Sequence, residues 1–122
     1  MPLPSAPETL QIEIQPYSGA TVVKLIGSAN MEVDASLRDR LIALLEQRCA
    51  PLVLDLSELR FITSCGLGGI IAAHLHCRHT KNEIRLVSPQ PAILELLEIT
   101  KLTKLFPIHP TVESALRITV KY

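Results

Sequence analysis

Short apolar segments alternate with segments of helical periodicity along most of the chain, and this alternation limits the fold more than any other feature. Apolar and polar residues alternate over residues 9–15, and a β-branched apolar run follows at residues 20–26. With the Pro-Tyr-Ser-Gly turn between them, these runs predict an antiparallel hairpin that ends at Gly27. Apolar runs at residues 52–56, 84–87 and 105–108 predict three further strands.

Apolar residues at helical spacing follow the hairpin and each of the three later strands. Asp34 and Thr111 are expected to cap the first and last helices, the second is expected to run from Ser64 to about Lys81, and the third to begin at residues 88–91. The predicted order is β-β-α-β-α-β-α-β-α. It favours an α/β fold with a mixed β-sheet, in which β-α-β crossovers follow the N-terminal antiparallel hairpin.

Size and charge exclude several classes of protein. The 122 residues suit one domain, and we expect residues 1–8 to form a flexible leader and residues 9–120 the domain. Basic and acidic residues balance at 12 each, which disfavours nucleic-acid binding and an electrostatic membrane anchor. No apolar run approaches the roughly 20 residues of a membrane helix, and the cysteines lack a Cys-x-x-Cys pair. We therefore expect a cytoplasmic protein without direct membrane insertion.

The segment that ends in Ser64 is the best candidate for a binding site. A strand predicted to be buried (residues 52–56) precedes an expected loop (residues 57–60), and a helix then begins at Ser64. Serine is a favourable N-cap residue, and Gly66 and Gly68 leave the backbone of the first turns open to close approach. The helix dipole favours negative charge there, and carboxyl ends of strands are the usual ligand sites of α/β sheets.

From Leu54-Asp55-Leu56-Ser57 to Ser64-Cys65-Gly66-Leu67-Gly68, the sequence resembles the STAS family, and within it the bacterial anti-sigma factor antagonists. The resemblance covers about residues 9–119. It implies that Ser64 is the phosphorylation site. Thr63 stands where these antagonists usually carry Asp, and it supplies an alternative phosphate acceptor. The resemblance also implies a partner-binding surface made by Asp55, Ser57, Thr63, Ser64, Cys65, Gly66, Leu67 and Gly68.

The function that this resemblance implies is that of a switch and not of an enzyme, and it requires no cofactor. The unmodified antagonist binds an anti-sigma factor that is also a serine kinase, which frees the sigma factor for transcription. Phosphorylation releases the antagonist, and a phosphatase resets it. The alternative is a STAS subunit of a lipid-transport or other membrane transport complex that docks on an ATPase without phosphorylation. Neighbouring kinase and sigma-factor genes, or transporter genes, would distinguish the two.

Asp55, Cys65 and a group of His and Cys residues are each candidates for a catalytic, redox or metal site. Asp55 is a candidate catalytic carboxylate, but no second carboxylate or base is placed beside it, so we interpret it as a partner of backbone N–H groups. Cys65 at a helix start is a candidate low-pKa thiol, which we interpret as a substitute for a small residue. Four potential zinc ligands crowd one predicted helix: His74, His76, Cys77 and His79.

We expect no metal site there, because these side chains do not converge. His74 falls on the apolar face of the helix, together with Leu67, Ile70, Ile71 and Leu75. His76 and His79 point elsewhere. In the third helix, Leu94, Leu97 and Ile99 are expected to lie in the core, although apolar exposure there would be compatible with a homodimer.

Overall fold

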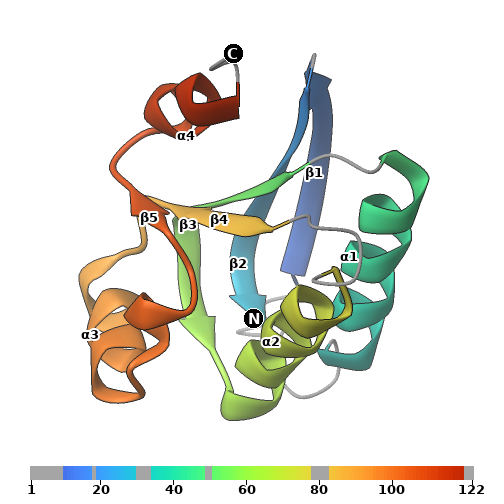
Figure 1. Cartoon of the computed structure of the whole chain (residues 1–122). Helices are drawn as coiled ribbons and strands as arrows, with labels where there is room; N and C mark the ends of the chain where they lie inside the picture. Colours follow the sequence, from blue (N-terminus) through green and yellow to red (C-terminus); the bar gives the residue numbers. More distant parts are fainter. Residues whose placement is uncertain (1–9, 18, 30–33, 49–50, 78–82, 120–122) are drawn as a thin grey trace, which may run out of the picture.

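The computed structural model describes residues 10–17, 19–29, 34–48, 51–77 and 83–119. The order of elements is the predicted one (Figure 1). The strands and helices are β1 (Leu10–Tyr17), β2 (Ala20–Ala29), α1 (Asp34–Arg48), β3 (Leu52–Ile62), α2 (Ser64–Cys77), β4 (Ile84–Val87), α3 (Pro91–Ile99), the 3₁₀ turn η3 (Leu102–Lys104), β5 (Ile108–His109) and α4 (Val112–Thr119).

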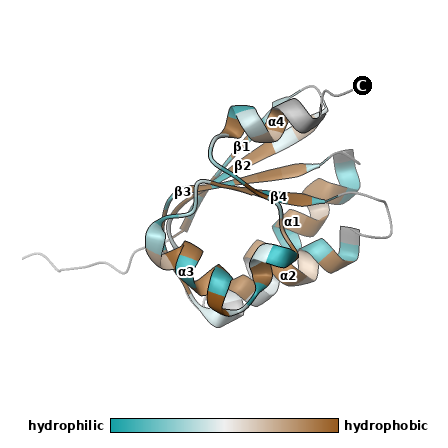
Figure 2. Ribbon diagram, turned by 60° about the vertical axis from the view of Figure 1, so that its left-hand side comes forward, coloured by the Kyte–Doolittle hydropathy of each residue, from teal (hydrophilic) through white to brown (hydrophobic). Residues whose placement is uncertain are grey.

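The sheet is mixed, as predicted, and its strands follow the order β1-β2-β3-β4-β5. β1 pairs antiparallel with β2, whereas β2, β3, β4 and β5 run parallel to one another. Right-handed crossovers between adjacent parallel strands place α1, α2 and α3 on one face of the sheet. α4 covers the other face, so the sheet lies between two helical layers (Figures 1 and 2).

Two apolar clusters hold these layers together. The main core lies between the sheet and the layer of α1, α2 and α3, and Leu25, Leu41, Leu54, Ile70 and Phe106 are among its buried side chains. The second cluster is much smaller and lies under α4, where Ala20, Val22, Val53, Val87 and Ala115 pack together. Since apolar burial scales with area, the main core contributes most of the hydrophobic stabilisation.

The hairpin is longer than predicted. β1 continues through Pro16 to Tyr17, and Tyr17 pairs with Ala20. Proline is tolerated because β1 is an edge strand, whose outer N–H groups need no partner. Gly27 does not end β2: it has a φ of 103° at an irregularity in the pairing with β3, and the strand continues to Ala29. Glycine adopts this left-handed conformation without steric cost.

The largest correction concerns β3, because the expected loop at residues 57–60 is strand. β3 runs to Ile62 and stays paired with β2 through two register shifts. Asp55 pairs with Lys24 and Glu58 with Ile26, so β3 has one extra residue between these pairs. A second extra residue, Arg60, follows the pair of Leu59 with Gly27. These bulges let Leu59 and Ile62 remain in the core while the strand bends.

Three smaller expectations were wrong. The last strand begins at Ile108 and not at residue 105, because the preceding segment forms η3 and places Phe106 in the main core. Leu75 and Ile99 were expected in the core, but they are 48 % and 70 % exposed. α2 is described as far as Cys77, so the expected end near Lys81 lies outside the described residues, as does the capping contact of the Asp34 side chain at the start of α1.

Candidate functional site

Thr63 is the single residue between β3 and α2, and it is the N-cap of α2. Its carbonyl oxygen accepts a hydrogen bond from the backbone N–H of Leu67 at 2.9 Å. Its Oγ1 accepts one from the backbone N–H of Gly66 at 3.0 Å. Both bonds belong to an N-cap residue, so the expectation that Ser64 caps this helix is corrected.

Ser64 is the first residue of α2, and its side chain is exposed to solvent. The first turn of the helix contains no acidic residue. Because the positive end of the helix dipole lies here, a negative group attached at this position is stabilised by the backbone. The structure thus presents a reachable hydroxyl at the start of a helix, at the carboxyl end of a central strand.

The residues that follow Ser64 divide between core and surface. Gly66 is buried, and Leu67 packs in the main core with 7 % of its surface exposed. Gly68 is exposed. The side chain of Cys65 lies outside the described part of the structure. Among the described residues of this segment, Ser64 and Gly68 are therefore the exposed ones, and the Leu67 side chain anchors it.

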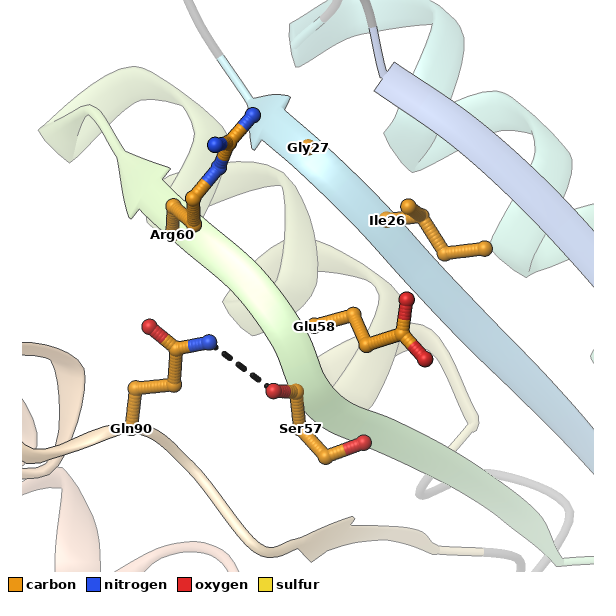
Figure 3. Close-up of a pocket in the computed structure, with 6 residues that line it drawn as sticks. All are labelled: Ile26, Gly27, Ser57, Glu58, Arg60 and Gln90. Carbon is orange, nitrogen blue, oxygen red and sulfur yellow. Dashed lines mark hydrogen bonds between the residues drawn. The ribbon is translucent and has the colours of Figure 1, made fainter.

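Asp55 and Ser57 lie further back along β3, at the first bulge. Asp55 Oδ1 accepts a hydrogen bond from the backbone N–H of Ser57 at 3.0 Å, which is the backbone role that we expected for this carboxylate. The carbonyl oxygen of Ser57 accepts a bond from Gln90 Nε2 at 2.9 Å (Figure 3). The bulge is thus held from its own strand and from the residue that precedes α3.

A hollow opens beside this bulge (Figure 3). It is lined by Ile26, Gly27, Ser57, Glu58, Arg60 and Gln90. This hollow was not predicted, because residues 57–60 were expected to be a loop and Gln90 belongs to another segment. A signal was nevertheless present in Leu59 and Ile62, two apolar residues that a surface loop has no need to bury.

Lys24 lies among carboxylates on the face of the sheet against which α4 packs. Its Nζ is 2.6 Å from Glu58 Oε2. In the strand register it stands between Glu13 of β1 and Asp55 of β3. The hydrogen bond to Glu58 raises the pKa of Lys24 above its ordinary value of 10.5, and the charges of Glu58, Asp55 and Glu13 act in the same direction. This lysine offsets the repulsion among three acidic side chains.

His74 and His76 are the candidate zinc ligands whose side chains the structure describes, and they face different neighbours. His74 is buried, and its ring meets the edge of Phe106 at a centroid distance of 4.9 Å. His76 points to α1, where its Nε2 lies 2.8 Å from Glu46 Oε2. His79 lies outside the described residues. Within the described part of the chain, no group of three or more His, Cys, Asp or Glu side chains is placed to hold a metal ion.

The mixed sheet, the helical layers on both faces and the exposed serine at the start of α2 define the class of protein. A family model described as STAS domain matches residues 11–115, and the chain belongs to this family. The similar sequences indicate which kind of STAS protein this chain resembles. An anti-sigma F factor antagonist of Paenibacillus polymyxa is 29 % identical over 108 residues, which are 88 % of this chain and 92 % of the relative.

Two mycobacterial proteins are also similar. The anti-sigma-F factor antagonist RsfA of Mycobacterium tuberculosis is 27 % identical over 112 residues, or 90 % of this chain and 88 % of the relative. The crystal structure of an anti-sigma factor antagonist from Mycobacterium paratuberculosis superposes with a TM-score of 0.84 and 27 % identity, covering 96 % of this chain and 99 % of the other. Among the helices described here, none is long and apolar enough to cross a membrane.

Proposed function

We propose that this protein is an anti-sigma factor antagonist that works as a phosphorylation switch. Its unmodified form binds an anti-sigma factor that is also a serine kinase, and this binding frees a sigma factor for transcription. Phosphorylation of Ser64 releases the antagonist, and a phosphatase restores it. The observation that carries the proposal is the exposed Ser64 hydroxyl at the first residue of α2. The similar antagonists, matched over most of their length, support it.

Ser64 suits phosphorylation better than its neighbour Thr63. Thr63 Oγ1 accepts the hydrogen bond that caps α2, and Thr63 is partly buried. A phosphate on Thr63 would replace the cap, whereas a phosphate on Ser64 leaves it in place. At neutral pH a phosphoserine carries about −1.5 to −2 charges, which the helix dipole stabilises. The domain therefore stays folded when modified.

Phosphorylation that leaves the domain folded weakens its binding to the partner. A surface that packs against a hydroxyl must instead accommodate a hydrated dianion of about −1.5 to −2 charges. A penalty of about 3 kcal/mol weakens binding more than roughly 100-fold, since each ~1.4 kcal/mol is a factor of ten. We place the contact surface at the exposed part of the residues from Thr63 to Gly68, with Asp55 and Ser57 behind it as supports for β3. The activity is binding, exercised in the cytoplasm, and the chain itself catalyses nothing.

The test uses the full chain with a candidate anti-sigma factor kinase from the same organism. We expect the kinase and ATP to phosphorylate the wild type at Ser64, located by mass spectrometry, and to leave Ser64→Ala unmodified. Ser64→Ala should bind the kinase within about threefold of wild type, whereas Ser64→Asp should bind at least about tenfold more weakly.

A matched control places the same charge in the first turn of another helix. Ser114 lies in the first turn of α4, on the opposite face of the sheet. Ser114→Asp should bind the kinase as the wild type does. Equal affinity of Ser64→Asp and Ser64→Ala would refute the switch.

A further inference from the structure

Within the described part of the chain, β1 has a neighbouring strand on one side alone, so it leaves one edge of the sheet open (Figure 1). This strand is eight residues long, whereas β5 at the opposite edge has two residues. Short edge strands, lysines and bulges are the usual protections against pairing with another chain. The length of β5 protects its edge. β1 is long and pairs regularly with β2, and its one charged residue is Glu13.

The hairpin shows which backbone groups of β1 face the open edge. Pro16 has no N–H, and its partner in the register is Thr21. The N–H of Thr21 points to the other side, where it donates to the carbonyl oxygen of the residue before β3 at 3.1 Å. The pair of Pro16 and Thr21 is therefore not a bonded one. Because bonded and non-bonded pairs alternate along an antiparallel ladder, Leu10, Ile12 and Ile14 also turn their N–H and C=O groups outward.

The side chains of the same three residues share one face of the sheet, since side chains alternate along a strand. Leu10 and Ile12 pack against the main core. Ile14 lies further along and is 42 % exposed. The open edge thus combines free backbone donors and acceptors with an apolar side chain that the described part of its own chain leaves largely uncovered.

We propose that a second copy of this chain pairs with β1 along this edge, antiparallel and about a two-fold axis at Ile12. Each Ile12 then lies opposite the same residue of the second copy, and Ile14 lies opposite Leu10 of the second copy. Three pairs of residues exchange about six hydrogen bonds, and the exposed Ile14 side chain gains an apolar neighbour. The two sheets become one continuous sheet. This inference goes beyond the proposed function and does not depend on it.

The position of the axis follows from Glu13 and Pro16. An axis at Glu13 would set two carboxylates directly opposite each other, which is unfavourable. An axis at Ile14 would set Ile12 opposite Pro16, which has no N–H to donate. With the axis at Ile12, Glu13 lies opposite the uncharged Gln11 of the second copy. The strand is therefore complementary to itself in this register.

The first test compares proline at the open edge with a charge on a different surface. A contact between two strand edges is small and gives a weak dimer, so sedimentation equilibrium should cover about 10 µM to 1 mM of the full chain. Wild type should pass from monomer towards dimer over this range. Ile14→Pro should stay monomeric and folded, because it removes an outward N–H and keeps the bonds between β1 and β2. Ile99→Lys is the matched control: Ile99 is 70 % exposed on α3, and this variant should dimerise as wild type does.

A pair of charge variants tests the register and does not require the strand to accept a proline. Gln11 is exposed and lies opposite Glu13 of the second copy. Gln11→Lys should therefore tighten the dimer about threefold or more, and Gln11→Glu should weaken it by a similar factor. Gln15→Lys adds the same charge to an exposed residue of β1 that does not lie opposite Glu13, and it should leave the association unchanged.

Amide hydrogen exchange locates the contact. The amides of Ile12 and Ile14 should gain protection as the protein concentration rises, whereas that of Glu13, bonded to β2, should be protected throughout. A wild type that stays monomeric at about 1 mM would overturn the inference. Loss of the dimer in Ile99→Lys but not in Ile14→Pro would place the contact on α3 and overturn it as well. Equal effects of Gln11→Lys and Gln11→Glu would refute the proposed register.

Discussion

At the start of α2, Thr63 does what an aspartate would do in its place. Asp and Thr side chains both accept hydrogen bonds from free N–H groups at a helix start. The exchange of the usual Asp for Thr63 therefore removes a charge beside Ser64 and keeps the cap, as the 3.0 Å bond to Gly66 shows. The cap of the helix and the charge beside Ser64 are thus separable at this position.

Variants of Thr63 test this separation. Thr63→Ala should lower the free energy of unfolding by about 1 kcal/mol, because the N–H of Gly66 loses its acceptor. Thr63→Asp should restore the cap to within roughly 0.5 kcal/mol of wild type. Urea unfolding monitored by circular dichroism measures both values. Ser64→Ala is the control and should change little, and a larger loss in Ser64→Ala than in Thr63→Ala would contradict the assignment of the cap.

Lys24 gives a prediction at high pH. Its pKa is higher in the folded chain than the ordinary 10.5, chiefly because of the hydrogen bond to Glu58. A raised folded pKa means that the stabilisation is complete below the unfolded value and is lost as the pH rises through the folded value. The stability difference between wild type and Lys24→Met should therefore be constant up to about pH 10 and shrink above it.

Urea unfolding at pH 9 and at pH 11.5 measures that difference for Lys24→Met. A gap that widens with pH in Lys24→Met would show that Glu58, Asp55 and Glu13 do not act on Lys24 as described.

At the scale of elements, β3 shows why a local pattern predicts some strands and not others. Ile84–Val87 was predicted at its observed bounds because it is short, apolar and unbroken. β3 breaks the alternation of its side chains at two bulges, so its second half loses the period that marks a strand. Pairing with β2 over that half is a long-range interaction, which residues 57–62 alone do not reveal.

The first bulge should depend on Asp55. Asp55→Ala removes the acceptor of the Ser57 N–H and should lower the free energy of unfolding by about 1 kcal/mol, whereas Asp55→Asn keeps an oxygen there and should lose less. Chemical denaturation measures both variants. Amide hydrogen exchange should show the loss of protection concentrated at the bulge in Asp55→Ala. A larger destabilisation by Asn than by Ala would contradict a hydrogen-bonding role.

The start of the last helix was predicted correctly, whereas the cap of α2 was missed by one residue. Thr111 was predicted as the cap of the last helix, and its Oγ1 accepts the N–H of Ser114 at 3.0 Å. The partition of α2 and α3 between core and surface was predicted less well. Leu75 and Ile99 are apolar residues at helical spacing, yet they lie where no other described element covers them. Spacing identifies a face, and only the tertiary arrangement decides how far along the helix it is covered.

At the scale of the whole molecule, the two faces of the sheet differ in strength. α4 packs on a small cluster that includes Ala20, Val53 and Ala115, which buries little apolar area. A buried arginine of β4 strengthens its attachment: Arg85 Nη1 donates to the carbonyl oxygen of Ala115 at 2.9 Å, and Arg85 Nε lies 2.6 Å from Glu83 Oε2. Since α2 and Ser64 belong to the other layer, the attachment of α4 is physically separate from the proposed site at Ser64.

This arrangement predicts two levels of opening. Arg85→Ala removes both contacts and should lower the free energy of unfolding by about 2 kcal/mol, a moderate value for a buried pair because Glu83 remains partly hydrated. Hydrogen exchange should show α4 losing protection first, while β3 and α2, which the main core holds, retain theirs until global unfolding.

Phe106→Ala is the matched variant. It empties the main core, should destabilise by about 3–5 kcal/mol, and should reduce protection in every element together. If Arg85→Ala instead reduced protection in α4, β3 and α2 to the same extent, the two faces would form one cooperative unit, and the proposed site at Ser64 would not be independent of α4.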